Sequence, residues 1–345
     1  MELCVSPEDN GSGPKILLAG GQEACEAECL YCQGCGTVRP LAEGQLRPWV
    51  LAEPRRPVNV LWTGRGQTAD SLAGLVSQMT SWGAGDVRLT AGPGSALRSQ
   101  DLAMLRQAGV SILGLAQIAV WPELDASLRL GGRSQGWWEA VWKLLPEACR
   151  LFGPGNVRVH LALGPGETEE QAIRAVQSVA NLGAVPLLRP LRPNSRLKFV
   201  PVSQGKVYRI LAARGLISQG LSSAEQMQFN EFGQVIHYGL PVEGLEAFVQ
   251  GGVVDETLAD CLDCENFSRQ RDWTAWLEDL EAEGEPLAAR MRRLCDIDWQ
   301  EAWASRNCVF KLENVTFSDA EIENETESPY ALIASYAPGH DDDDL

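Results

Sequence analysis

The sequence lacks the features that mark membrane proteins and nucleic-acid-binding proteins. No apolar run approaches the about 20 residues that a helix needs to span a bilayer, and the chain begins with neither a basic nor an apolar leader segment. Positive charge is scarce, because 29 Lys and Arg stand against 46 Asp and Glu, a net charge of −17. Such a protein has no general attraction for a phosphate backbone or an anionic membrane. We therefore expect a cytoplasmic protein with no membrane and no nucleic-acid partner.

Histidine is also rare, with three residues, whereas cysteine is abundant, with ten. A cytosolic compartment keeps thiols reduced, so structural disulfides do not account for this number. Six of the ten fall into an early and a late cluster, which are Cys25, Cys29, Cys32 and Cys35, and Cys261 with Cys264. Close cysteine spacing in a reducing compartment predicts metal sites.

Short apolar or β-branched runs alternate with amphipathic stretches over the first half of the chain. The expected strands are residues 15–19, 58–62, 86–91, 111–115, 156–163 and 185–189. The expected helices between them are residues 69–82, 101–107, 137–152 and 169–181. Strand and helix in alternation predict an α/β fold with a parallel sheet and right-handed crossovers. The pattern leaves two architectures open, a doubly wound sheet or a partial or full (β/α) barrel.

The remainder is less regular and suggests further parts. Residues 202–216, 222–232 and 244–249 look helical, and residues 235–238 look like a strand. We place boundaries so that residues 1–252 form the α/β domain, 253–311 a mostly helical, cysteine-containing extension, and 312–345 a tail. The tail has ten carboxylates and no Lys or Arg, which predicts weak structure.

The most specific motif is C-x3-C-x2-C, formed by Cys25, Cys29 and Cys32 directly after the first expected strand. Three thiolates on one short loop can bind three irons of a [4Fe–4S] cluster and leave the fourth iron open. Zinc is the alternative, but a structural zinc site needs four ligands and usually joins two distant pairs. The three-residue gap, Tyr31 just before the last cysteine, and the position after a strand favour the cluster.

This motif resembles the signature of the radical SAM superfamily, in which it lies on the loop after the first strand of a partial or full (β/α) barrel. The resemblance implies that the open iron binds S-adenosylmethionine and that a 5′-deoxyadenosyl radical abstracts a substrate hydrogen. It also implies a ferredoxin- or flavodoxin-type electron donor. The cofactors would then be a [4Fe–4S] cluster and S-adenosylmethionine, and Tyr31 would lie beside them.

The resemblance also implies two turns that bind S-adenosylmethionine. Ala91 and Gly92 match a glycine-rich turn whose backbone carbonyls meet the methionine amine. Gly164 and Glu167 match the end of a strand motif that packs beside adenine, although His160 stands where the family has glycine. A simpler alternative role for Glu167 is that of a carboxylate stabilised by the positive end of a helix dipole.

Three further side chains have two interpretations each. Arg189 and Arg192 follow an expected strand, where an arginine can bind a carboxylate of the methionine moiety or of the substrate. Alternatively they are surface arginines paired with acidic side chains. His160 lies on a strand from which it could face the cofactor, or it is a core histidine.

Within the superfamily the stretches around residues 120–124, 152–157 and 185–194 resemble the biotin synthase and lipoyl synthase group. This resemblance favours sulfur insertion into a small-molecule or carrier-bound acyl substrate, with a second radical SAM subunit as a candidate partner. The late pair Cys261 and Cys264 resembles the ligands of an auxiliary cluster in that group. The first candidates to complete a second [4Fe–4S] cluster are Cys295 and Cys308, and the alternatives for these four thiols are zinc or buried free cysteines.

Two other functional hypotheses stay open. One is a radical SAM enzyme for carbon-skeleton or cofactor-maturation chemistry without sulfur insertion. The other is an iron–sulfur or zinc protein with a structural or carrier role. Metal content discriminates among the three, because sulfur insertion with an auxiliary cluster requires about eight irons per chain, one cluster requires about four, and zinc indicates the third hypothesis.

Overall fold

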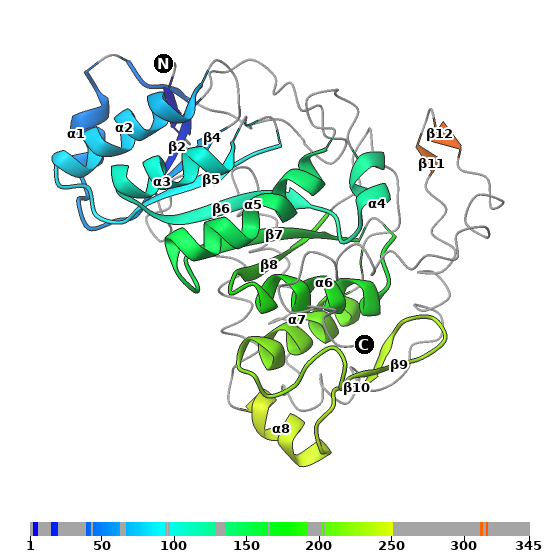
Figure 1. Ribbon diagram of the computed structural model, residues 1–345. Helices are drawn as coiled ribbons and strands as arrows, with labels where there is room; N and C mark the ends of the chain where they lie inside the picture. The colour runs from blue at the N-terminus through cyan, green and yellow to red at the C-terminus, as the bar shows by residue number, and fades with distance from the viewer. Residues whose placement is uncertain are drawn as a thin grey trace, which may run out of the picture.

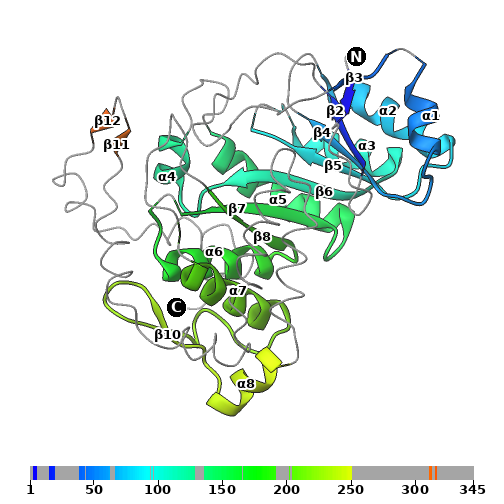
Figure 2. The ribbon, with the colours of Figure 1, turned by 180° about the vertical axis from the view of Figure 1, so that it is seen from behind.

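The structure is a computed structural model that describes residues 3–5, 15–19, 39–42, 44–62, 67–93, 95, 97–128, 136–164, 166–191, 202, 204–250, 311–312 and 315–316. Its main element is an eight-stranded sheet in the order β3-β1-β2-β4-β5-β6-β7-β8 (Figures 1 and 2). The strands are β1 Leu3–Val5, β2 Lys15–Ala19, β3 Arg39–Pro40, β4 Val58–Trp62, β5 Val87–Ala91, β6 Val110–Ile118, β7 Val157–Leu163 and β8 Val185–Pro190. All six expected strands are therefore present.

The strand order decides between the two architectures that the sequence left open. From β2 to β8 the parallel strands follow one another in chain order, with no point at which the order reverses. A doubly wound sheet needs such a reversal, whereas an unbroken order with right-handed crossovers keeps all helices on one face, as in a (β/α) barrel. In the described residues β3 and β8 form two edges, so the sheet there is an open, partial barrel.

The helices are α1 Leu46–Leu51, α2 Ala69–Ser81, α3 Ser99–Ala108, α4 Pro122–Ser127, α5 Trp137–Phe152, α6 Glu169–Asn181, α7 Gln204–Ser218 and α8 Val242–Gln250. Of these, α2, α3, α5, α6 and α7 contact strands of the sheet, and crossovers of one hand place them on one face. Helix α5 lies in front of β6 and β7 in Figure 1 and behind them in Figure 2. Thr68 and Thr168 begin α2 and α6 with capping boxes, which explains why the sequence located both starts well. None of the helices described here combines the length and apolarity that crossing a bilayer requires.

The expected helix over residues 222–232 is wrong. This segment forms turns and then β9 (Gln228–Phe229), which pairs with β10 (Val235–His237). Asn230 closes the hairpin, because its side-chain oxygen accepts hydrogen bonds from the backbone N–H groups of Phe232 and Gln234. Gly233 completes the turn with a positive φ of 71°. The expected helices over residues 202–216 and 244–249 and the expected strand over residues 235–238 are confirmed as α7, α8 and β10, with bounds that differ by a few residues.

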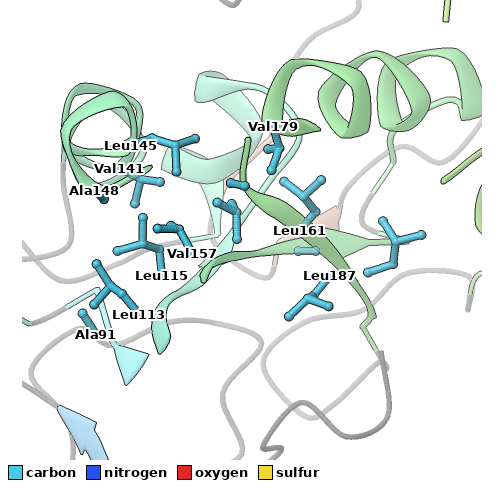
Figure 3. Close-up of a cluster of buried hydrophobic side chains, with 14 of the residues drawn as sticks. Ala91, Leu113, Leu115, Val141, Leu145, Ala148, Val157, Leu161, Val179 and Leu187 are labelled. Carbon is cyan, nitrogen blue, oxygen red and sulfur yellow. The ribbon is translucent and has the colours of Figure 1, made fainter. Parts of the chain in front are cut away.

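The two faces of the sheet differ in chemistry. On the helix face, Val157 and Leu161 of β7 pack with Leu115 of β6 beneath Val141 and Leu145 of α5, and all five side chains are buried (Figure 3). The opposite face, called the inner face below, is mixed. The strand register across β4 to β8 places the polar side chains of Asn59, Thr90, Arg158, His160 and Arg189 on it, among apolar residues such as Leu61 and Leu187.

The domain division stays a prediction. Beyond residue 250 the structure describes only β11 (Lys311–Leu312) and β12 (Val315–Thr316), which form an antiparallel pair. The extension up to residue 310 and most of the tail lie outside the described residues.

Candidate functional site

The candidate residues converge on one edge of the sheet. Strand β2 ends at Ala19, and residues 20–38, which contain the cysteine triad, follow it directly. Strands β5, β7 and β8 run parallel to β2, so their carboxyl ends meet the same edge. Gly92 and Gly164 come directly after β5 and β7, and Arg189 is the penultimate residue of β8. Catalytic sites of parallel α/β proteins lie at this edge.

Close backbone packing requires a glycine after β5. The Gly92 N–H donates to the carbonyl oxygen of Trp62 at 2.9 Å, and a Cβ at position 92 would lie 3.1 Å from that oxygen. The Gly92 carbonyl in turn accepts from the N–H of Ser95 at 2.9 Å. Ala91 is fully buried on the strand. This turn therefore brings bare backbone to the sheet edge, as a contact through main-chain carbonyls would need.

Glu167 closes the turn that follows β7. Its Oε1 accepts from the Gly164 N–H at 2.7 Å and lies 3.0 Å from Nζ of Lys206 on α7. Lys206 also donates to the backbone carbonyl of Glu167. The carboxylate is fully buried, and among the described residues its Oε2 has no hydrogen-bond partner. Thr168, not Glu167, caps α6, so the sequence-based alternative of a helix-terminal carboxylate misses the main role of Glu167.

The inner face places a histidine beside two arginines. His160 and Arg189 are buried with 5% and 1% of their surfaces exposed, and Arg158 lies on the same face of β7. Burial, and then the positive charges of Arg189 and Arg158, hold the pKa of His160 well below its ordinary value. The imidazole is therefore neutral near pH 7. Arg189 is not the surface arginine of the alternative interpretation, because it is buried.

Sequence reasoning missed the pairs that join α6 to α7. Arg209 donates from Nε to Oε1 of Glu169 at 2.8 Å, one helical turn along α7 from the Lys206–Glu167 pair. Burial raises the pKa of Glu169, although the hydrogen bond and charge of Arg209 oppose the shift. Basic residues three apart on an otherwise apolar helix are a signal for such buried pairs. The partners, 39 and 40 residues away, carry no local sign of the pairing.

None of the predicted metal ligands lies in the part of the chain that the structure describes. The residues that lie outside the described part of the chain are Cys25, Cys29, Tyr31, Cys32, Arg192, Cys261, Cys264, Cys295 and Cys308. The described residues contain no group of three His, Cys, Asp or Glu side chains that could hold a metal ion. Cys149 of α5 is described, and burial raises the pKa of its thiol to about 11. Such a thiol is an unreactive part of the packing, as its position among apolar residues predicts.

No protein-family model matches the sequence, and no curated protein matches it. Three solved structures are similar in part. The FeFe-hydrogenase maturase HydG from Carboxydothermus hydrogenoformans is 14% identical with a TM-score of 0.43, over 57% of this chain and 49% of that one. Coproporphyrinogen III oxidase (HemN) from Escherichia coli, a radical SAM enzyme, is 17% identical with a TM-score of 0.33, over 51% of this chain and 44% of that one. Methylornithine synthase (PylB) is 14% identical with a TM-score of 0.42, over 75% of this chain and 84% of that one. The chain thus spans about half the length of the first two proteins.

Proposed function

We propose that the protein is a radical SAM enzyme that binds a [4Fe–4S] cluster through Cys25, Cys29 and Cys32. The observation that carries the proposal is the position of the C-x3-C-x2-C motif directly after β2, the first of six parallel strands that follow one another in chain order. The glycine turn after β5 and the Glu167 turn after β7 reach the same edge of that sheet. Together, the cluster and S-adenosylmethionine supply a 5′-deoxyadenosyl radical, after one electron from a ferredoxin- or flavodoxin-type donor.

The described residues fit S-adenosylmethionine in two respects. The turn at Gly92 has no side chain and little room for a Cβ, which suits a ligand held by the main chain. The buried Oε2 of Glu167, which has no partner among the described residues, is an acceptor for a hydrogen bond from a ligand donor. Arg189, buried near the end of β8, supplies a guanidinium for a carboxylate of the methionine moiety or of the substrate. Arg192, predicted from the sequence to have the same chemistry, lies outside the described residues.

Sulfur insertion is the finer proposal within this class. It rests on the late cysteines and on the likeness of the sequence to the biotin and lipoyl synthase group, and it requires a second cluster. The substrate would then be a small molecule or a carrier-bound acyl group, and a second radical SAM subunit would be a partner. Carbon-skeleton or cofactor-maturation chemistry requires only the first cluster.

Anaerobic reconstitution tests the proposed function. We expect the wild-type protein to bind iron and sulfide, to give a reduced-cluster electron paramagnetic resonance signal that changes with S-adenosylmethionine, and to release 5′-deoxyadenosine under dithionite. The triple variant Cys25→Ala, Cys29→Ala, Cys32→Ala should no longer release 5′-deoxyadenosine. The variant Cys149→Ala should still release it, because Cys149 belongs to α5 and packs against the core. Release of 5′-deoxyadenosine by the triple variant would overturn the assignment. Zinc in place of iron, or iron without the release, would favour a structural or carrier protein.

A further inference from the structure

Lys206 holds both the side chain and the backbone of Glu167. Its Nζ lies 3.0 Å from Oε1 of Glu167 and donates to the carbonyl oxygen of the same residue. Both side chains are buried, with 7% of Lys206 and none of Glu167 exposed. Because Oε1 also accepts from the Gly164 N–H, one lysine ties both Gly164 and Glu167 to α7.

A second buried pair extends this brace. Arg209 binds Glu169, whose other oxygen accepts from the Val235 N–H at 2.9 Å. The hydroxyl of Tyr238 donates to the carbonyl of Arg209 at 3.2 Å. This second pair ties α6 and α7 to the β9–β10 hairpin, so it lies farther from the Gly164 turn than the first. It is equally buried, which makes it a natural comparison for the first pair.

Stability alone is a poor explanation of the Lys206–Glu167 pair. A buried ion pair loses so much hydration that apolar residues of similar size are often as stabilising or more so. The pair instead fixes a geometry. Separating the two side chains would leave a buried charge without its partner, so they stay together. It fixes the turn that ends β7, at the sheet edge where β2, the strand before the cysteine motif, also ends. In the described part of the chain, Oε2 of Glu167 has no hydrogen-bond partner.

We propose that Lys206 is a positioning residue for S-adenosylmethionine, which acts through Glu167 to hold the 164–167 turn in its binding conformation. This inference rests on the proposed function. Lys206 makes no contact with the cofactor in this scheme. Its effect is on the position of the turn and on the orientation of the Glu167 carboxylate.

The test compares two buried cations of α7 in the reconstituted, full-length protein. Lys206→Met should raise the Kd for S-adenosylmethionine, measured by anaerobic titration calorimetry, by about 10- to 100-fold, the loss of affinity that is typical when a partner that orients a ligating group is removed from a metal site. Arg209→Met removes the matched cation from the second pair. It should lower the melting temperature by a similar amount yet leave the Kd unchanged.

A double variant separates binding from stability. Glu167→Gln with Lys206→Met leaves no unpaired buried charge, and the amide oxygen can still accept from the Gly164 N–H. Its melting temperature should recover toward that of the wild type, while its Kd should stay high because α7 no longer anchors the turn. Recovery of the Kd along with the melting temperature would show that Lys206 serves stability alone, as would equal Kd values for the two single variants. If the wild-type protein itself fails to bind S-adenosylmethionine, the proposed function falls and this inference with it.

Discussion

His160 shows how a single residue of the inner face ties stability to pH. In the folded protein, burial and the charges of Arg189 and Arg158 hold the pKa of His160 well below its ordinary value. In the unfolded chain the imidazole titrates near about pH 6.5. The unfolded state therefore binds more protons below that pH. The stability associated with neutral His160 is present above about pH 6.5 and is lost as the pH falls toward the folded-state pKa.

Replacing His160 with Gln should remove this component. In the wild type, protonation of His160 in the unfolded chain should lower the free energy of unfolding by up to about 1.4 kcal/mol for each pH unit below 6.5. Urea unfolding of both proteins at several pH values between 7.5 and 5.5 measures the difference. Carboxylates and other histidines contribute equally to both curves, so the difference isolates His160. Parallel curves would mean that the folded protein protonates His160 readily.

At the scale of single residues, the sequence predicts which residues belong to the site better than it predicts which residues contact one another. The resemblance pointed to Glu167 and Arg189, and the structure places both at the expected edge of the sheet. It did not point to Lys206, because the ion pair with Glu167 spans 39 residues and depends on how α6 and α7 pack. A motif within one segment can be read from the chain, whereas a pair across two segments needs their packing.

The helix α5 illustrates the next scale, that of the element. Its three tryptophans, Trp137, Trp138 and Trp142, lie at helical spacing, and all three are buried. The indole N–H groups add directional contacts. Trp137 donates to the carbonyl of Ala116 at 3.0 Å and Trp138 to that of Ala119 at 3.2 Å, so α5 holds the irregular end of β6. The indole N–H of Trp142 is buried and has no hydrogen-bond partner among the described residues.

Substitution by phenylalanine should separate these two roles. Trp138→Phe and Trp142→Phe remove the same atoms from neighbouring buried sites on one helix. Only Trp138→Phe leaves a buried carbonyl without its donor, which costs about 1–3 kcal/mol beyond the lost packing. Trp142→Phe removes a buried donor that has no partner, so it should destabilise the protein less. Urea unfolding measures both variants, and equal losses would contradict a role for the indole hydrogen bonds.

Elements were predictable where their pattern is long. The six parallel strands and the helices α2, α5 and α6 have apolar periodicity over five or more residues, and the sequence located them within a few positions. The two-residue strand β3 and the six-residue helices α1 and α4 are too short to show a period. The segment 222–232 was misassigned because the turn at Asn230 depends on side-chain hydrogen bonds that hydrophobic periodicity ignores.

At the scale of the whole molecule, the strand order explains why distant segments can build one site. Because β2 and β4 to β8 are parallel and ordered as in the chain, every loop at their carboxyl ends reaches the same sheet edge. The sequence predicted the parallel sheet but not the order of its strands, since alternating strands and helices fit both a barrel and a doubly wound sheet. Order is a property of strand pairing between segments, and no single segment records it.

The late cysteines decide whether the whole molecule inserts sulfur. Cys261 and Cys264 lie outside the described residues, so their role stays a prediction based on spacing and resemblance. If they bind an auxiliary cluster, changing both to Ala should remove about half of about eight irons per chain. Product formation should stop, whereas uncoupled release of 5′-deoxyadenosine should continue, because radical generation needs only the cluster held by Cys25, Cys29 and Cys32. A sulfur donor acts later, after the hydrogen has left the substrate.

Iron and sulfide analysis of the double variant, alongside the 5′-deoxyadenosine assay, makes this separation measurable. Cys149→Ala is the matched control, because that thiol packs on α5 and its loss should change neither the iron content nor the release. Full iron content in the Cys261→Ala, Cys264→Ala variant would remove the auxiliary cluster and with it the support for sulfur insertion. Loss of both iron and 5′-deoxyadenosine release would instead mean that the two clusters depend on each other, since the late cysteines could not then be assigned to a step after radical formation.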